Sequence, residues 1–162
     1  MNFKNLLAAV SIVSIAVVSC KSAPENPEVE NYVYKLSPSL ALEELPIIKK
    51  FDSIPVDQLL KNPKIDSIIQ TDIIDSYSDF IKKLDTVNLK DPELKAIHAK
   101  YIDYAKHRLD YYNAFLLNLK GGSKSNIDSL NPKADQLMPM HDEYLKLLGK
   151  LVEKYELEYS DK

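Results

Sequence analysis

The longest uninterrupted helical pattern in the chain runs from residue 92 to residue 120. It starts at Asp91-Pro92, a capping residue followed by proline at the first helical position, and it stops at Gly121-Gly122. A helix that is apolar over much of its circumference must be covered on several sides, so we predict that this one is central. Its apolar residues recur at spacings of three and four: Leu94, Ile97, Tyr101, Ala105, Tyr112, Leu116 and Leu119, with Ile102, Tyr104, Tyr111 and Phe115 beside them.

Two further long helices are predicted by the same spacing. The first covers residues 65–84, and the second carries Tyr144, Leu148 and Leu151 and should pack on the central helix. Pro139 either begins this last helix or kinks a longer helix that starts near Pro132, and both alternatives remain open.

The first third of the domain is interrupted by Pro38, Pro46 and Pro55. Proline ends a helix or fits only its first turn, so we expect short helices and corners here. No strand alternation or hairpin turn is evident in the sequence. The prediction is an all-α fold, an antiparallel bundle of three long helices plus short N-terminal helices, forming one domain over residues 31–162.

Composition excludes several kinds of site. The chain has 21 basic and 24 acidic residues and no long basic tract, which argues against a nucleic-acid partner. It has only three glycines, too few for the glycine-rich loops that bind nucleotide phosphates. Its single cysteine allows neither an internal disulfide nor a cysteine-based zinc site. We expect no cofactor.

The first nineteen residues are typical of an export signal. Lys4 is followed by thirteen residues, Leu6 to Val18, that are apolar apart from two serines. This run is shorter than the ~20 apolar residues that a membrane-spanning helix needs, so we expect residues 1–19 to be cleaved. The only cysteine, Cys20, comes directly after Val17-Val18-Ser19, where the apolar run ends.

The sequence Val17-Val18-Ser19-Cys20 resembles the lipobox of bacterial lipoprotein precursors. The resemblance covers the leader alone, and it implies that a peptidase cuts before Cys20 and that Cys20 carries a diacylglyceryl group and usually a further acyl chain such as palmitate. Two or three chains hold a protein on a membrane far more durably than one. The alternative is an ordinary signal peptide followed by a free thiol.

Residues 20–30 are polar, contain two prolines and are interpreted as a flexible, lipidated tether. Tyr32 and Tyr34, next to it, are expected to be exposed. Lys21 is not the aspartate that retains some lipoproteins in the inner membrane, and the start "CKS" resembles outer-membrane lipoproteins of the Bacteroidetes. The resemblance therefore implies the outer membrane of the cell envelope, on either its periplasmic or its external face.

One cluster of polar residues in the central helix has the spacing of metal ligands. Asp103, His107 and Asp110 lie at i, i+4 and i+7 and share a face, and His141 of the last helix is a further candidate. One helix cannot supply a converging ligand set alone, so we interpret these residues as a solvated polar face and expect no metal.

Arg108 is the only arginine and lies near Tyr104, Tyr111 and Tyr112 along the helix. Arginine stacks on tyrosine and binds carboxylates through two hydrogen bonds, so these four residues are a candidate ligand site. The alternative interpretations are a buried ion pair or a single structural arginine.

No catalytic motif is evident, and we do not expect an enzyme. We expect a lipid-anchored envelope protein with a helical domain that binds an unknown protein or polymer. The alternative is a carrier of a small ligand or metal, with a pocket between the helices around Arg108 and His107.

Overall fold

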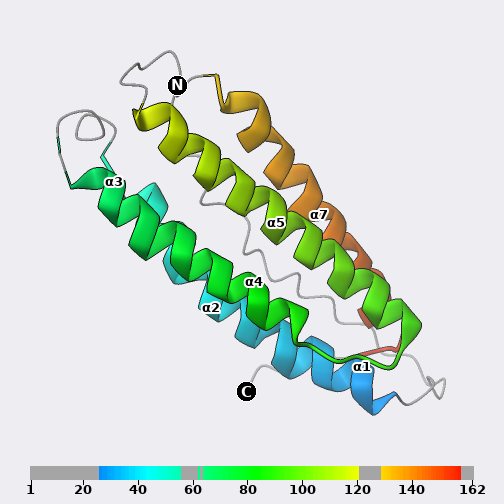
Figure 1. Ribbon diagram of the computed structural model, residues 1–162. Coiled ribbons are helices and arrows are strands. Elements are labelled where there is room, and N and C mark those ends of the chain that lie inside the picture. Colours follow the sequence, from blue (N-terminus) through cyan, green and yellow to red (C-terminus); the bar gives the residue numbers. More distant parts are fainter. Residues whose placement is uncertain (1–25, 56–61, 63, 121–128, 158–162) are drawn as a thin grey trace.

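The computed structural model describes residues 26–55, 62, 64–120 and 129–157, and these residues form an all-α fold without strands. Four long helices follow one another in antiparallel order (Figure 1). The predicted fold class is confirmed, but the predicted number of long helices is wrong, because the N-terminal third forms a fourth. No helix in these ranges has the length and apolar character needed to cross a membrane.

The first long helix is continuous through three segments, α1 (Pro27–Asn31), the π-helical η2 (Tyr32–Leu36) and α2 (Ser37–Asp52). Pro38 follows the wide π-helical turn, in which the Ser37 N–H bonds to the Tyr32 carbonyl, and so falls in the first turn of α2. Pro46 lies inside α2 with its side chain in solvent. The helix persists past both prolines because its other face is buried.

The ordered domain starts earlier than the sequence indicated. The Asn26 side chain caps α1 by accepting hydrogen bonds from the N–H groups of Glu28 and Val29. Val29 and Tyr32 are completely buried, whereas Tyr34 is exposed as expected. Residues 26–30 therefore belong to the helical domain, not to the tether, and the prediction for Tyr32 was wrong.

The second long helix consists of α3 (Ile65–Ile68), the π-helical η3 (Ile69–Asp75) and α4 (Ser76–Asp85). This confirms the predicted helix over residues 65–84, although its π-helical stretch was not foreseen. The short helices and corners expected around Pro55 fall mostly on residues 56–61, which lie outside the described ranges.

The third long helix, α5 (Pro92–Lys120), confirms the helix predicted over residues 92–120 and its bounds. At its start, Oδ1 of Asp91 accepts hydrogen bonds from the N–H groups of Glu93 (2.8 Å) and Leu94 (2.9 Å). The Glu28 carboxylate accepts from the N–H groups of Lys90 and Asp91, and the Asn26 side chain donates to Asp91. The start of the first helix is thus fixed to the start of α5.

The last helix, α7 (Asn131–Lys154), begins before Pro139, which lies inside it. The longer-helix alternative is therefore the one observed. As predicted, α7 packs on α5, and the rings of Tyr101 and Tyr144 stack with their centroids 4.7 Å apart.

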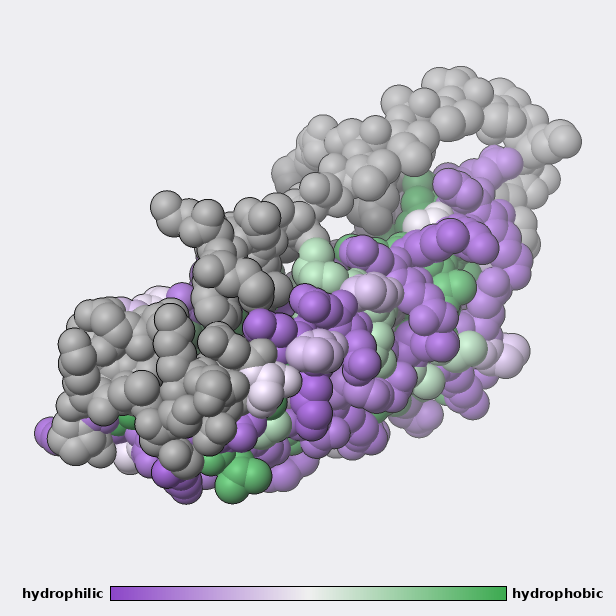
Figure 2. Space-filling model, turned by 90° about the horizontal axis from the view of Figure 1, so that it is seen from above, coloured by the Kyte–Doolittle hydropathy of each residue, from purple (hydrophilic) through white to green (hydrophobic). Residues whose placement is uncertain are grey.

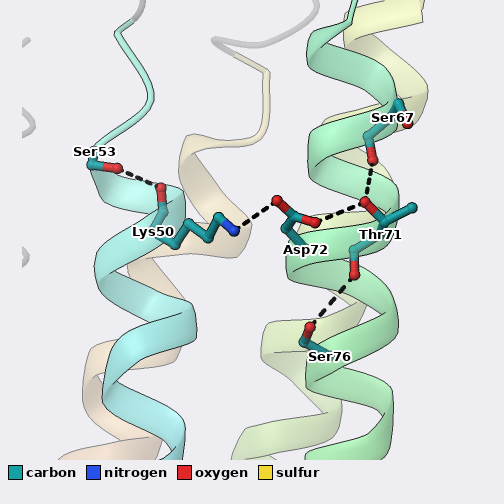
Figure 3. A network of polar contacts seen from close by, with 6 residues as sticks. All are labelled: Lys50, Ser53, Ser67, Thr71, Asp72 and Ser76. Carbon is teal, nitrogen blue, oxygen red and sulfur yellow. Dashed lines mark hydrogen bonds and ion pairs between the residues drawn. The ribbon is translucent and has the colours of Figure 1, made fainter.

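Exposed ion pairs join neighbouring helices at their outer edges. Between the first and second helices, Lys50 lies 2.6 Å from Asp72, whose other carboxylate oxygen contacts the Thr71 hydroxyl (Figure 3). The remaining cross-helix pairs are Lys83–Glu43, Lys106–Asp85, Lys100–Glu143 and Lys154–Glu93. Within the described ranges no ion pair joins the first helix to α7, although the buried Ser37 and Tyr144 hydroxyls do meet at 2.8 Å.

Candidate functional site

The candidate metal ligands do not converge. Asp103, His107 and Asp110 are exposed on the outer face of α5, where Nδ1 of His107 donates to the Asp103 carbonyl at 2.9 Å. His141 is half-buried on α7, beside the Tyr104 ring. Within the described ranges, no three histidine, cysteine or acidic side chains lie close enough together to hold a metal ion.

Arg108, in contrast, points into the bundle and meets an acidic residue there. Its Nε atom lies 3.9 Å from Oε1 of Glu44, and the two side chains are 8% and 6% exposed. Glu44 comes from α2, so this contact joins two elements that are far apart in the sequence. The structure therefore contains the buried ion pair that was one interpretation of the lone arginine.

Two tyrosines complete the coordination of the Glu44 carboxylate. The Tyr77 hydroxyl of α4 donates to Oε1, and the Tyr101 hydroxyl of α5 donates to Oε2 at 2.7 Å. Burial, followed by the nearby Glu44 charge, raises the pKa of each tyrosine well above its usual value. Both hydroxyls therefore remain protonated donors at neutral pH, and they compensate the carboxylate for its loss of water.

The predicted tyrosines take different places around Arg108. Its Cζ atom lies 5.0 Å from the centroid of the Tyr104 ring, and Nη1 donates to the Tyr112 hydroxyl at 3.4 Å. Tyr111 instead packs against Phe51 and Tyr112. Burial and, to a smaller extent, the charge of Asp52 raise the pKa of Tyr111 to about 12. Two of the three tyrosines thus contact the guanidinium directly.

One donor of this arginine is left over. Nε of Arg108 is buried and has no hydrogen-bond partner among the described residues. A buried N–H without a partner is costly, because it loses its water without gaining a replacement. The centre therefore retains one donor nitrogen without a hydrogen bond, 3.9 Å from Oε1 of Glu44.

His141 borders this polar centre from α7. Its ring centroid lies 5.0 Å from that of Tyr104. Burial lowers the pKa of His141, with Glu44 opposing that shift and Arg108 adding to it. The histidine is thus held in its neutral form over more of the acidic pH range than a free imidazole.

A second buried polar link was missed by the sequence reasoning. His98 of α5 donates from Nε2 to the Leu84 carbonyl at 2.9 Å, so its Nδ1 accepts from the Tyr32 hydroxyl at 3.0 Å. Both Glu44 and His98 fall on the apolar faces of their helices, and this is the signal that would have identified them. A polar residue in such a stripe needs a buried partner.

An exposed apolar surface lies on the first helix. Tyr34, Pro38, Ala41 and Leu45 recur at spacings of four, three and four, and Leu42 lies between Pro38 and Leu45. Leu42 is 71% exposed and Tyr34 is 39% exposed, Pro38 and Ala41 are exposed as well, and Leu45 is half-buried. We call these five residues the apolar strip. Hydrophilic residues dominate the described part of the face shown in Figure 2.

A family model described as "Uncharacterised lipoprotein PM1805" matches residues 58–156. The match covers more than half of the chain and includes the second helix, α5 and α7. No curated protein and no solved structure matches the chain.

Proposed function

Because the chain belongs to the family described as "Uncharacterised lipoprotein PM1805", we propose that it is held on the outer membrane by acyl chains on Cys20 and that its four-helix domain is a non-catalytic binding module. The observation that carries the binding role is the apolar strip. Apolar side chains that recur along one side of a surface helix and are largely exposed are a common mark of an interaction site. We propose that a partner covers this strip.

Cys20 itself lies outside the described residues, so its role rests on the leader sequence and on membership of a lipoprotein family. The described domain begins at Asn26, six residues after Cys20. Six extended residues span at most about 20 Å, so an anchor at Cys20 would keep the domain beside its membrane.

The non-catalytic assignment rests on the state of the polar centre. Its charged groups, Glu44 and Arg108, are buried and engaged with each other and with tyrosines. Such an arrangement holds charges in place and leaves no carboxylate exposed to a substrate. This supports a structural role for the centre, and we propose that binding takes place at the surface instead.

Metabolic labelling with palmitate tests the anchor. The wild-type protein should incorporate label and the Cys20→Ser variant should not. Label that persists in Cys20→Ser would overturn the assignment. Protease treatment of intact cells then distinguishes the external face, where the domain is digested, from the periplasmic face, where it is protected.

Crosslinking in intact cells tests the binding role. A photoreactive residue at position 42 should give a saturable adduct. The same residue at position 117 serves as the control, because Leu117 is 72% exposed but lies on α5. Equal, non-saturable crosslinking from both positions would contradict a binding surface on the first helix.

A small-ligand carrier is the second candidate function, favoured by the buried Nε of Arg108 that has no partner. His107 does not contribute to this centre, because its side chain is exposed. Small carboxylates such as acetate and succinate should then raise the melting temperature of the wild-type protein but not that of Arg108→Ala. Equal shifts in the two proteins, or none, would reject the carrier.

A further inference from the structure

We propose that the partner of the apolar strip is the lipid bilayer that carries the anchor, so that the first helix lies along the membrane surface. This inference rests on the proposed function and names the partner of the same site. It would give the protein a second membrane contact besides its acyl chains, one that fixes the orientation of the domain.

The distribution of charge around the strip suits a bilayer surface. Lys35 and Lys49 are exposed near its two ends. The acidic residues between these two lysines lie elsewhere: Glu43 pairs with Lys83 toward α4, and Glu44 is buried in the bundle. One exposed acidic residue, Glu30, lies one turn before Tyr34. A helix face with apolar residues at its centre and lysines at its edges is typical of helices that lie in the membrane interface, where the lysines reach the lipid phosphates.

The size and composition of the strip also fit the interface. From Tyr34 to Leu45 a helix rises about 17 Å, at about 1.5 Å per residue. Tyrosine favours the headgroup level, and leucine favours the region just below it. Tyr34 and Leu42 thus have the chemistry for the two depths that such a helix occupies.

The anchor would bring this strip to the membrane. Asn26 follows Cys20 by six residues, which reach at most about 20 Å, and Tyr34 lies about 10 Å further along the helix from Pro27. Docking of the strip would then be an intramolecular step, favoured by the high effective concentration that a short tether imposes. A strip too small to bind a membrane alone can therefore stay docked.

The lone cysteine makes a direct test possible. Once Cys20 is acylated, its sulfur no longer reacts with maleimides, so Leu42→Cys provides a single reactive thiol in the mature lipoprotein. The labelled protein, purified with its acyl chains, is reconstituted into phosphatidylethanolamine and phosphatidylglycerol vesicles. A bimane dye at position 42 is compared with the same dye at position 117, which is equally exposed but lies on α5.

Lipids with brominated acyl chains should quench the dye at position 42 and leave the dye at position 117 unaffected, whereas aqueous iodide should do the reverse. Adding Leu45→Asp should abolish bromine quenching at position 42 while the helical circular dichroism is retained. The control is Asn113→Asp, which adds the same charge at an exposed position of α5 and should not change the bromine quenching at position 42.

Three other outcomes would overturn the inference, and they separate it from the proposed function. A dye at position 42 that is shielded from iodide but not quenched by bromine means that a second copy of the chain covers the strip, because the vesicles contain no other protein; the binding role then survives without the bilayer. Iodide quenching at both positions rejects docking on the bilayer, and crosslinking in intact cells then decides separately whether a protein partner covers the strip. Failure of the wild-type protein to float with the vesicles rejects the anchor, and the docking with it.

Discussion

Glu44 and Arg108 lie 64 positions apart in the sequence, yet their side chains face each other at 3.9 Å inside the bundle. Neither group reaches water to any great extent, so each depends on its neighbours to compensate its charge. Tyr77 and Tyr101 bind the carboxylate, while Tyr104 and Tyr112 contact the guanidinium. The pair therefore links α2, α4 and α5 through one polar centre.

Replacing Arg108 with methionine should lower the free energy of unfolding by roughly 3–5 kcal/mol, because it leaves the buried Glu44 without its counter-charge. Urea denaturation followed by circular dichroism measures this loss. The control is Lys106→Met, which removes an exposed cation of the same helix and should cost at most about 1 kcal/mol.

A double variant checks the cause of that loss. Glu44→Gln with Arg108→Met should be less destabilised than the sum of the two single variants, because each single change leaves the other charge alone. Strictly additive losses would mean that the two residues stabilise the fold independently.

Stability should fall at mildly acidic pH because of His141. Its folded-state pKa is lowered by burial, so the unfolded chain binds more protons, and the free energy of unfolding must rise with pH. The contribution is complete above the unfolded value of about 6.5 and declines as the pH falls toward the folded value. His141→Gln should flatten the stability profile between pH 7 and 5, and an unchanged profile would contradict the prediction.

The start of the domain can be tested at Val29, which is completely buried although residues 20–30 were expected to form a tether. Val29→Ala should lower the free energy of unfolding by about 2 kcal/mol through lost apolar burial. Glu30→Ala, at the exposed neighbouring position, should change it by less than about 0.5 kcal/mol. Equally small changes in the free energy of unfolding for the two variants would mean that residues 26–30 are part of the tether and not of the folded domain.

Gly149→Ala should stabilise the protein. Gly149 lies inside α7, and a Cβ atom placed there would meet no other atom within 4 Å. Alanine restricts the unfolded chain and favours the helix, which contributes roughly 0.5–1 kcal/mol. The melting temperature should rise by a few degrees, and a decrease would show that the site is less open than described.

The helices at residues 65–84 and 92–120 could be predicted because local signals agree there: the apolar spacing, the cap at Asp91 and the glycines after Lys120. The first helix was predicted as short pieces because Pro38 and Pro46 are local signals for a break. They were outweighed by burial of Leu40, Glu44 and Phe51 on the opposite face, which depends on the other helices.

The polar centre could be predicted only in part for the same reason, because some of its contacts depend on other helices. Arg108 and its tyrosines stood out as one cluster because they lie within one helix. Glu44 did not, because its partners Tyr77, Tyr101 and Arg108 are brought to it only by the assembled bundle. An acidic residue in an apolar stripe is a local sign of such pairing, but it does not identify the partner.

The joint between the starts of the first helix and α5 has a mechanical consequence. Asn26 and Glu28 hold Asp91 and the backbone before α5, so a pull on the chain at residue 26 would load two parallel helices at once. A force applied through an anchored N-terminus would be divided between the first helix and α5. The first helix would resist being peeled away turn by turn.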